Sequence, residues 1–97
     1  MEKKVIKELF ELTIIFKGHV QGVGFRYKTN YIAKKYDISG WVKNLYDGSV
    51  QVKASGTRKE LIMFENDVRE TFARNIESVE ENFLPTYIKG RDFNIIY

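Results

Sequence analysis

Three glycines and one arginine are concentrated in the segment GHVQGVGFR, which runs from Gly18 to Arg26. Glycine lets the main chain turn sharply and lets a ligand approach the backbone N–H groups. A helix that starts directly after such a loop adds unpaired N–H groups and the positive end of a dipole. The segment therefore predicts a binding site for an anion, and its geometry suits phosphate best.

Arg26 distinguishes this segment from an ordinary flexible turn. It falls in the first turn of the expected helix, where the helix dipole disfavours a cation unless an anion occupies the site. Its planar guanidinium can grip two phosphate oxygens at once. The spacing is not that of a Walker A motif, which needs a Lys-Ser/Thr ending. It is not the dinucleotide-binding fingerprint either, because Tyr27 stands where that pattern has its last glycine.

A second notable stretch, GWVKNLYDGSVQVKASG, runs from Gly40 to Gly56 and predicts a β-hairpin. Asp47-Gly48 is a strong turn signal between its two strands. Asn44 is less easily explained, since asparagine is disfavoured within strands. It could open the turn through its side chain, or it could serve the site. From the pattern alone, both interpretations stay open.

The hydrophobic pattern predicts the elements that must position these residues. Alternating apolar residues indicate strands, and apolar residues three or four apart indicate helices. Thr57, with Glu60 three residues later, is typical of a helix N-cap. The expected strands cover 10–17, 37–44, 49–55, 76–83 and 93–97, with Pro85 and Gly90 ending the fourth, and the expected helices cover 25–36 and 61–72.

This order is βαββαβ with a short extra C-terminal strand. Two helices cannot cover both faces of so small a sheet, so we expect both on one face of a mainly antiparallel sheet. The predicted fold class is α+β, a ferredoxin-like sandwich. We expect one domain over residues 1–97, with residues 1–8 as a flexible N-terminal extension.

Composition narrows the chemistry further. The chain has no cysteine, which excludes disulfides and thiolate metal sites and fits a reducing cytoplasm. With His19 as the single histidine, a transition-metal site is not expected. No apolar run approaches the ~20 residues that cross a bilayer, and the charged start lacks a signal peptide's apolar stretch. The net charge of +3 favours anionic ligands without choosing among them.

Both stretches resemble the acylphosphatase family. Its members carry G-x-V-Q-G-V-x-F-R before the first helix, as Gly18–Arg26 does. They carry G-W-V-x-N-x-x-x-G-x-V-x-x-x-x-x-G on the hairpin, and Gly40–Gly56 has every fixed position. The resemblance extends over 12–72 and weakens afterwards, where an expected apolar alternation is interrupted by Glu80, Glu81 and Asn82. These departures put the stability of the fourth strand in question.

The resemblance implies hydrolysis of the carboxylic–phosphoric anhydride of acyl phosphates to a carboxylate and inorganic phosphate, with no cofactor and no metal. It implies Arg26 as the phosphate-gripping residue and Asn44 as the residue that holds the attacking water. The expected phosphate-binding residues are Val20, Gln21, Gly22, Val23, Gly24 and Arg26. We expect a free-standing, monomeric cytoplasmic enzyme whose partner is a small acyl phosphate, with no nucleic acid or membrane partner.

Two other functions share some of these features. The RNA-recognition motif has the same element order and a glycine–aromatic signature that GVGFRY resembles. That signature belongs on the third strand, and the expected third strand, SVQVKAS, has no aromatic residue. The other alternative is a non-catalytic phosphate-binding module, because acylphosphatase-like domains also occur inside larger maturation proteins.

Overall fold

The computed structural model describes residues 8–97. The expected flexible extension over 1–8 therefore lies, apart from Glu8, outside the described residues. The two helices and five strands follow the predicted order. They are β1 (Leu9–Gly18), α1 (Phe25–Ala33), β2 (Ser39–Asn44), β3 (Val50–Thr57), α2 (Arg58–Thr71), β4 (Ile76–Thr86) and β5 (Phe93–Ile96).

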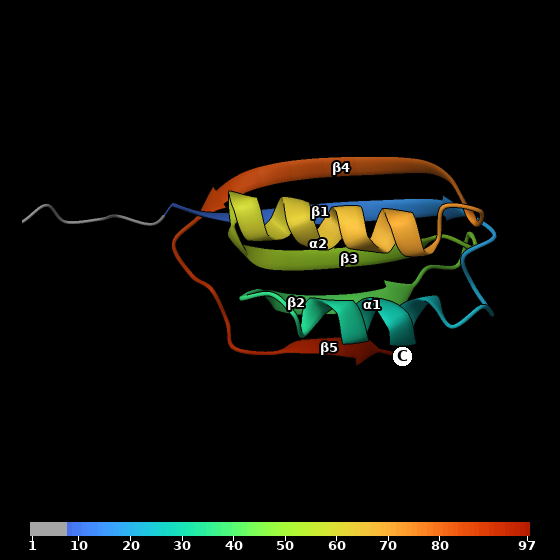
Figure 1. Cartoon of the computed structure of the whole chain (residues 1–97), viewed down its shortest axis with the longest axis horizontal. Helices are drawn as coiled ribbons and strands as arrows, with labels where there is room; N and C mark the ends of the chain where they lie inside the picture. The colour runs from blue at the N-terminus through green and yellow to red at the C-terminus, as the bar shows by residue number, and fades with distance from the viewer. Residues whose placement is uncertain (1–7) are drawn as a thin grey trace, which may run out of the picture.

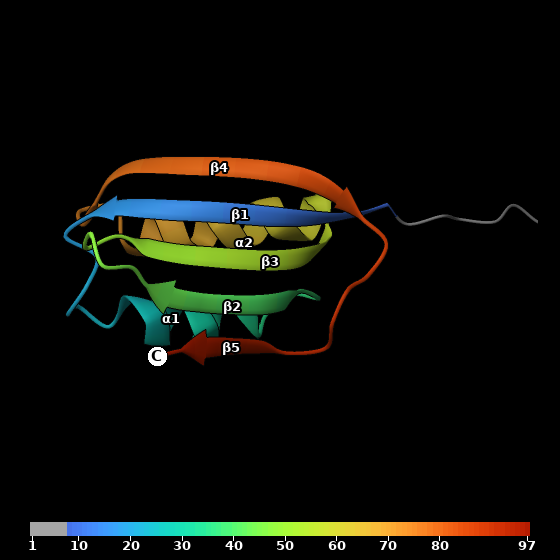
Figure 2. The ribbon, with the colours of Figure 1, turned by 180° about the vertical axis from the view of Figure 1, so that it is seen from behind.

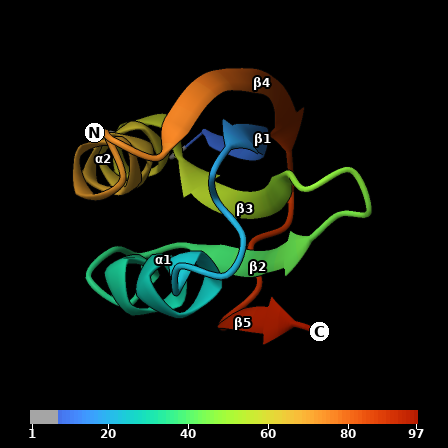
Figure 3. The same ribbon diagram turned by 90° about the vertical axis from the view of Figure 1, so that its right-hand side faces the viewer.

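The strands form one sheet in the order β4-β1-β3-β2-β5. β1 pairs antiparallel with β3 and β4, β2 pairs antiparallel with β3, and β5 runs parallel to β2. Both helices cover the same face: α2 lies near β1 and β3, and α1 lies near β2 and β5 (Figure 1). The opposite face is open (Figure 2), and the edge-on view separates the two layers (Figure 3). The predicted ferredoxin-like fold is confirmed.

The hydrophobic core lies between the sheet and the helices. Every second residue of β1 and β3 points to the helices, because side chains alternate along a strand. Leu12, Ile14 and Phe16 are accordingly fully buried. From the helix layer, Phe25 stacks on Phe72 with 4.4 Å between ring centroids. Phe25 is the first residue of α1, so this contact anchors the helix end that follows the glycine loop.

Several element boundaries differ from the prediction by a few residues, and the ends of α1 and β4 have a clear physical cause. α1 ends at Ala33, and Tyr36 lies in the following turn, where its hydroxyl donates a hydrogen bond to the Asp67 carboxylate of α2. This bond raises the pKa of Tyr36 to about 12. β4 continues through Pro85 to Thr86, so the expectation that Pro85 ends this strand was wrong. A proline is tolerated there because β4 is an edge strand with one side unpaired.

The polar residues of β4 divide between the two faces of the sheet. Glu81 is opposite Ile14 in the register and so faces the helix layer. There Arg69 of α2 contacts both Glu65, at 2.6 Å, and Glu81, at 3.6 Å. Burial raises the pKa of Glu65 to about 7, its hydrogen bond with Glu81 adds to the rise, and Arg69 opposes it. The departure from apolar alternation thus supplies a partner for charged groups on α2.

Within residues 8–97, neither helix is long and apolar enough to cross a membrane.

Candidate active site

The loop between β1 and α1 has a backbone that glycine makes possible. Gly22 and Gly24 have φ angles of 76° and 80°, in the left-handed region that other residues rarely adopt. Gly24 is also the N-cap of α1, and no side chain caps this helix start. The first N–H groups of α1 are therefore left for another acceptor, and an anion is the natural one.

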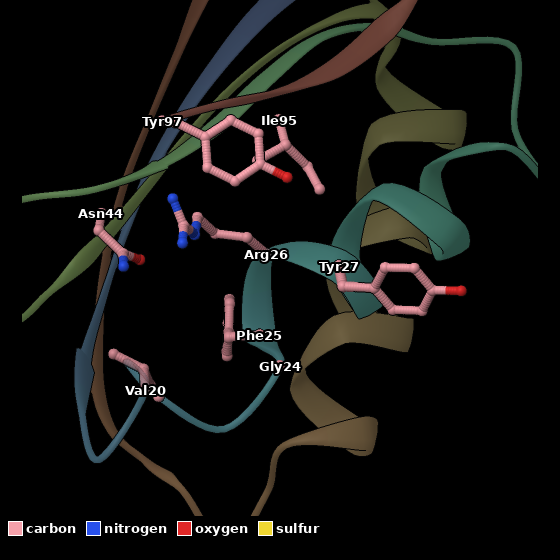
Figure 4. A pocket seen from close by; sticks show the side chains of 9 residues that line it. Val20, Gly24, Phe25, Arg26, Tyr27, Asn44, Ile95 and Tyr97 are labelled. Carbon is pink, nitrogen blue, oxygen red and sulfur yellow. The ribbon is translucent and has the colours of Figure 1, made fainter.

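Arg26 lies in the first turn of α1 and contacts the end of the chain. Its Nη1 donates to the main-chain oxygen of Ile96 at 3.4 Å. Its Cζ lies 4.9 Å from the centroid of the Tyr97 ring, a distance typical of cation–π contact. The guanidinium is thereby held over the cavity (Figure 4).

Strand alternation places Asn44 on the same side of the sheet as α1. Val42 is fully buried beneath the helices, and Asn44 follows it by two residues at the end of β2. The Asn44 carboxamide points toward the Arg26 guanidinium (Figure 4). Val42 pairs with Ile95 of the parallel strand β5, so Tyr97 follows Ile95 just as Asn44 follows Val42. The register therefore brings Tyr97 to the same site.

These residues surround one cavity of about 170 Å³. That is several times the ≈ 30 Å³ that a water molecule occupies in the liquid. Tyr27, although at the rim, directs its ring away from Arg26 and Asn44 (Figure 4). The cavity is lined by Val20, Gly22, Gly24, Phe25, Arg26, Tyr27, Asn44, Ile95 and Tyr97.

Most of the residues expected at the site meet here, but two of them do not line the cavity. Gln21 turns its side-chain amide to the β2–β3 turn, and Val23 packs against the hydrophobic core. His19, which the sequence analysis did not assign to the site, has an exposed side chain and is not among the lining residues. Phe25 and Tyr27, the neighbours of Arg26, also line the cavity although they were not predicted there. No local pattern could reveal Ile95 and Tyr97, because they reach the site through the pairing of β5 with β2.

The charges around the cavity favour an anion. Of the described residues, 8–97, Arg26 is the only one that lines the cavity with a side chain charged at neutral pH, and none of them lines it with a carboxylate side chain. Among residues 8–97, no group of three or more His, Cys, Asp or Glu side chains is placed to hold a metal ion. Such an arrangement can bind a phosphate group and hold a polar molecule at Asn44, and the lining residues within 8–97 include no histidine, aspartate or glutamate.

Comparison with known proteins points to one family. The acylphosphatase family model matches residues 12–95. An acylphosphatase of Clostridium acetobutylicum is 36% identical over 99 residues, covering 100% of this chain and 99% of that one. The crystal structure of the Bacillus subtilis acylphosphatase superposes with a TM-score of 0.80 at 31% identity, over 91% of this chain and 99% of that chain. The crystal structure of T. kodakarensis HypF resembles this chain with a TM-score of 0.76 at 27% identity, over 90% of this chain but only 12% of HypF.

Proposed function

The chain belongs to the acylphosphatase family and is an acyl phosphate hydrolase, and we propose that Arg26 and Asn44 divide its chemistry between them. The single observation that carries this proposal is their joint position on one cavity beside the uncapped start of α1. Arg26 and the main-chain N–H groups of the loop over Val20–Gly24 hold the phosphoryl group. Asn44 holds the attacking water.

The role of the loop follows from its backbone. The left-handed residues Gly22 and Gly24 bend the chain so that successive N–H groups can converge on one anion. These N–H groups carry only partial charges, whereas the phosphoryl group carries a full negative charge. Arg26 supplies the formal charge, and its planar fork matches two phosphoryl oxygens. Together they stabilise the charge that develops on the phosphoryl oxygens in the transition state.

Asn44 acts by orientation and not by proton transfer. A carboxamide does not titrate near neutral pH, so it cannot serve as a general base. Its oxygen can accept a hydrogen bond from water and so aim the water lone pair at phosphorus, as the water-orienting glutamine of GTPases does. The water oxygen bonds to phosphorus, the bond from phosphorus to the acyl oxygen breaks, and the carboxylate leaves. The water proton passes to a phosphoryl oxygen, and inorganic phosphate is the second product.

Phosphate release from acetyl phosphate or benzoyl phosphate by the wild type and by Asn44→Ala tests this division of labour. We expect Asn44→Ala to lose on the order of 10²–10³ in kcat, as is typical for the loss of one positioning group. Its competitive inhibition constant for phosphate should change little. If the rate stays and phosphate affinity falls, Asn44 is a binding residue and the water is held elsewhere. An RNA titration beside the assay tests the alternative of an RNA-binding module.

The oligomeric state, the compartment and the metal independence stay predictions: a monomer, a reducing cytoplasm and activity without a metal. Sedimentation of the purified chain and activity in the presence of a chelator would test the monomer and the metal independence.

A further inference from the structure

Gln21 makes two hydrogen bonds that leave its side chain outside the cavity. Its Nε2 donates to the main-chain oxygen of Leu45 at 2.8 Å and to that of Ser49 at 2.9 Å. A carboxamide nitrogen carries two hydrogens, so these bonds use its full donor capacity. Gln21 belongs to the glycine loop, whereas both acceptors belong to the turn between β2 and β3, more than twenty residues away in sequence.

The turn that accepts these bonds is a well-connected unit. The Leu45 N–H donates to the Ser49 oxygen at 2.9 Å, and the Gly48 N–H donates to the Leu45 oxygen at 3.2 Å. The Asp47 carboxylate accepts from the Ser49 N–H at 2.9 Å. Leu45 follows Asn44 directly, so a bond to the Leu45 carbonyl restrains the main chain one residue beyond the Asn44 side chain.

We propose that Gln21 is a positioning residue that sets the distance and angle between the phosphate-binding loop and Asn44. The inference rests on the proposed function of Arg26 and Asn44. It explains how a loop with two glycines in left-handed conformations can present a phosphoryl group at a defined place relative to a water. The glycines permit the loop to bend, and the Gln21 amide ties the loop to the turn that directly follows Asn44.

Small displacements matter at such a site. A misplacement of about 1 Å between reacting groups can cost on the order of 10²-fold in rate, even when the mutated residue is not in contact with the substrate. Gln21→Ala removes both bonds and should let the loop and the β2–β3 turn move relative to each other. We expect kcat to fall by about 10- to 100-fold, because water and phosphorus lose their alignment. The competitive inhibition constant for phosphate should change by less than about threefold, since Arg26 and the start of α1 stay in place.

The matched control is Gln51→Ala. Gln51 is a half-buried glutamine on β3, and no side-chain hydrogen bond involves it within residues 8–97. Its loss should leave kcat within about twofold of the wild type. Equal kcat values for Gln21→Ala and Gln51→Ala, both close to the wild type, would overturn the proposed role.

A double-mutant cycle separates positioning from a general structural effect. If Gln21 acts through Asn44, Gln21→Ala should lower kcat by less than about twofold in the Asn44→Ala background, because the water is no longer held there. A loss of the same size in both backgrounds would overturn the proposal. If the wild type releases no phosphate from acetyl phosphate, or Asn44→Ala keeps its rate, the proposed function fails and the inference with it. If the wild type hydrolyses acetyl phosphate and Asn44→Ala loses its rate, but Gln21→Ala keeps its kcat, the inference alone fails.

Gln21→Glu adds a second test, the pH dependence of kcat, which would not change if Gln21 only filled space. A carboxylate has no proton to donate and would face two carbonyl oxygens, so near neutral pH this variant should be at least as slow as Gln21→Ala. Protonation at lower pH restores one donor, and the ratio of its kcat to that of the wild type should rise as the pH falls. A pH-independent ratio would contradict the proposal.

One further test uses the wild type alone and so does not require that any variant folds. By NMR, the side-chain amide protons of Gln21 should exchange with solvent more than about tenfold more slowly than those of Gln51. Equal exchange rates for the two side chains would overturn the inference.

Discussion

The ring of Tyr97 lies over the guanidinium of Arg26, with 4.9 Å between the Arg26 Cζ and the ring centroid. The preceding residue, Ile96, accepts a hydrogen bond from the same guanidinium. Ile96 of β5 and the following Tyr97 therefore support Arg26, the side chain that the proposed mechanism uses to grip phosphate. Ile96 and Tyr97 lie outside the two sequence motifs.

Replacing Tyr97 tests this support. A cation–π contact at an exposed site is worth about 0.5–1 kcal/mol, which corresponds to about a two- to fivefold effect. We expect Tyr97→Ala to lower kcat/KM by about this factor, because Arg26 gains alternative rotamers. Tyr97→Phe keeps the ring and should retain the activity of the wild type. Tyr87→Ala, at a fully exposed tyrosine away from the cavity, is the matched control. Identical kcat/KM values for Tyr97→Ala and the wild type would show that the contact does not hold Arg26.

The geometry of the Arg26 side chain, and not its charge alone, should determine activity. Arg26→Lys retains a cation but loses the planar fork that can bind two phosphoryl oxygens. We expect it to be nearly as damaging as Arg26→Ala, with losses on the order of 10²–10³ in kcat/KM. Steady-state assays, with circular dichroism to verify folding, measure this. A folded Arg26→Lys variant with near-normal turnover would mean that charge suffices.

His19 should be dispensable. Its side chain is exposed and does not line the cavity, and the proposed mechanism uses no enzyme side chain as a base. His19→Gln should keep kcat within about twofold, and the pH–rate profile should lack a limb that depends on this residue. Profiles of both proteins between pH 5 and 8 provide the comparison. Loss of activity in the variant would instead identify His19 as the missing base.

Anions should occupy the glycine loop. Crystals grown in sulfate or phosphate should show the anion at the turn from Val20 to Arg26, held by main-chain N–H groups and the guanidinium. Arg26→Ala crystals from the same solution control for a lattice ion. An empty loop with Arg26 directed away from it would contradict the proposed binding mode.

Stability should depend on pH through Glu65. Its pKa rises from 4.5 to about 7 in the folded protein, mainly because burial disfavours the charged form. A group whose pKa is raised on folding contributes stability that is present below its unfolded pKa and is lost as the pH rises through its folded pKa. The contribution should therefore fall between pH 4.5 and about 7.

Urea unfolding of the wild type and of Glu65→Gln across this range isolates the effect. Relative to the variant, the wild type should lose on the order of 2–3 kcal/mol of unfolding free energy as the pH rises. The difference between the curves removes the contributions of carboxylates that do not contact Glu65, including Asp47, whose pKa is lowered by its hydrogen bonds with Ser49. Parallel curves would show that Arg69 keeps the buried Glu65 carboxylate ionised throughout.

The sequence by itself determined the features that depend on neighbouring residues. Alternation indicated β1 and β3, and it also places Asn44 on the same face as Val42. Thr57 was expected to cap α2, and its hydroxyl does accept a hydrogen bond from the Glu60 N–H at 3.3 Å. The glycine spacing before α1 predicted a sharp turn of the main chain, and the structure makes it with left-handed residues at Gly22 and Gly24. Each of these follows from forces that act within a few residues along the chain.

Only the tertiary structure decided which distant segments meet. The pairing of β5 beside β2 brings Tyr97 to Arg26, and the Gln21 side chain turns from the cavity to the Leu45 and Ser49 carbonyls. β4 passes through Pro85 because it is at the edge, and the register of β4 with β1 puts Glu81 on the helix side, where Arg69 contacts it. The physical reason is that strand order and register depend on how the whole hydrophobic core is buried. A local pattern records which face of a strand is buried, but not which strand lies beside it.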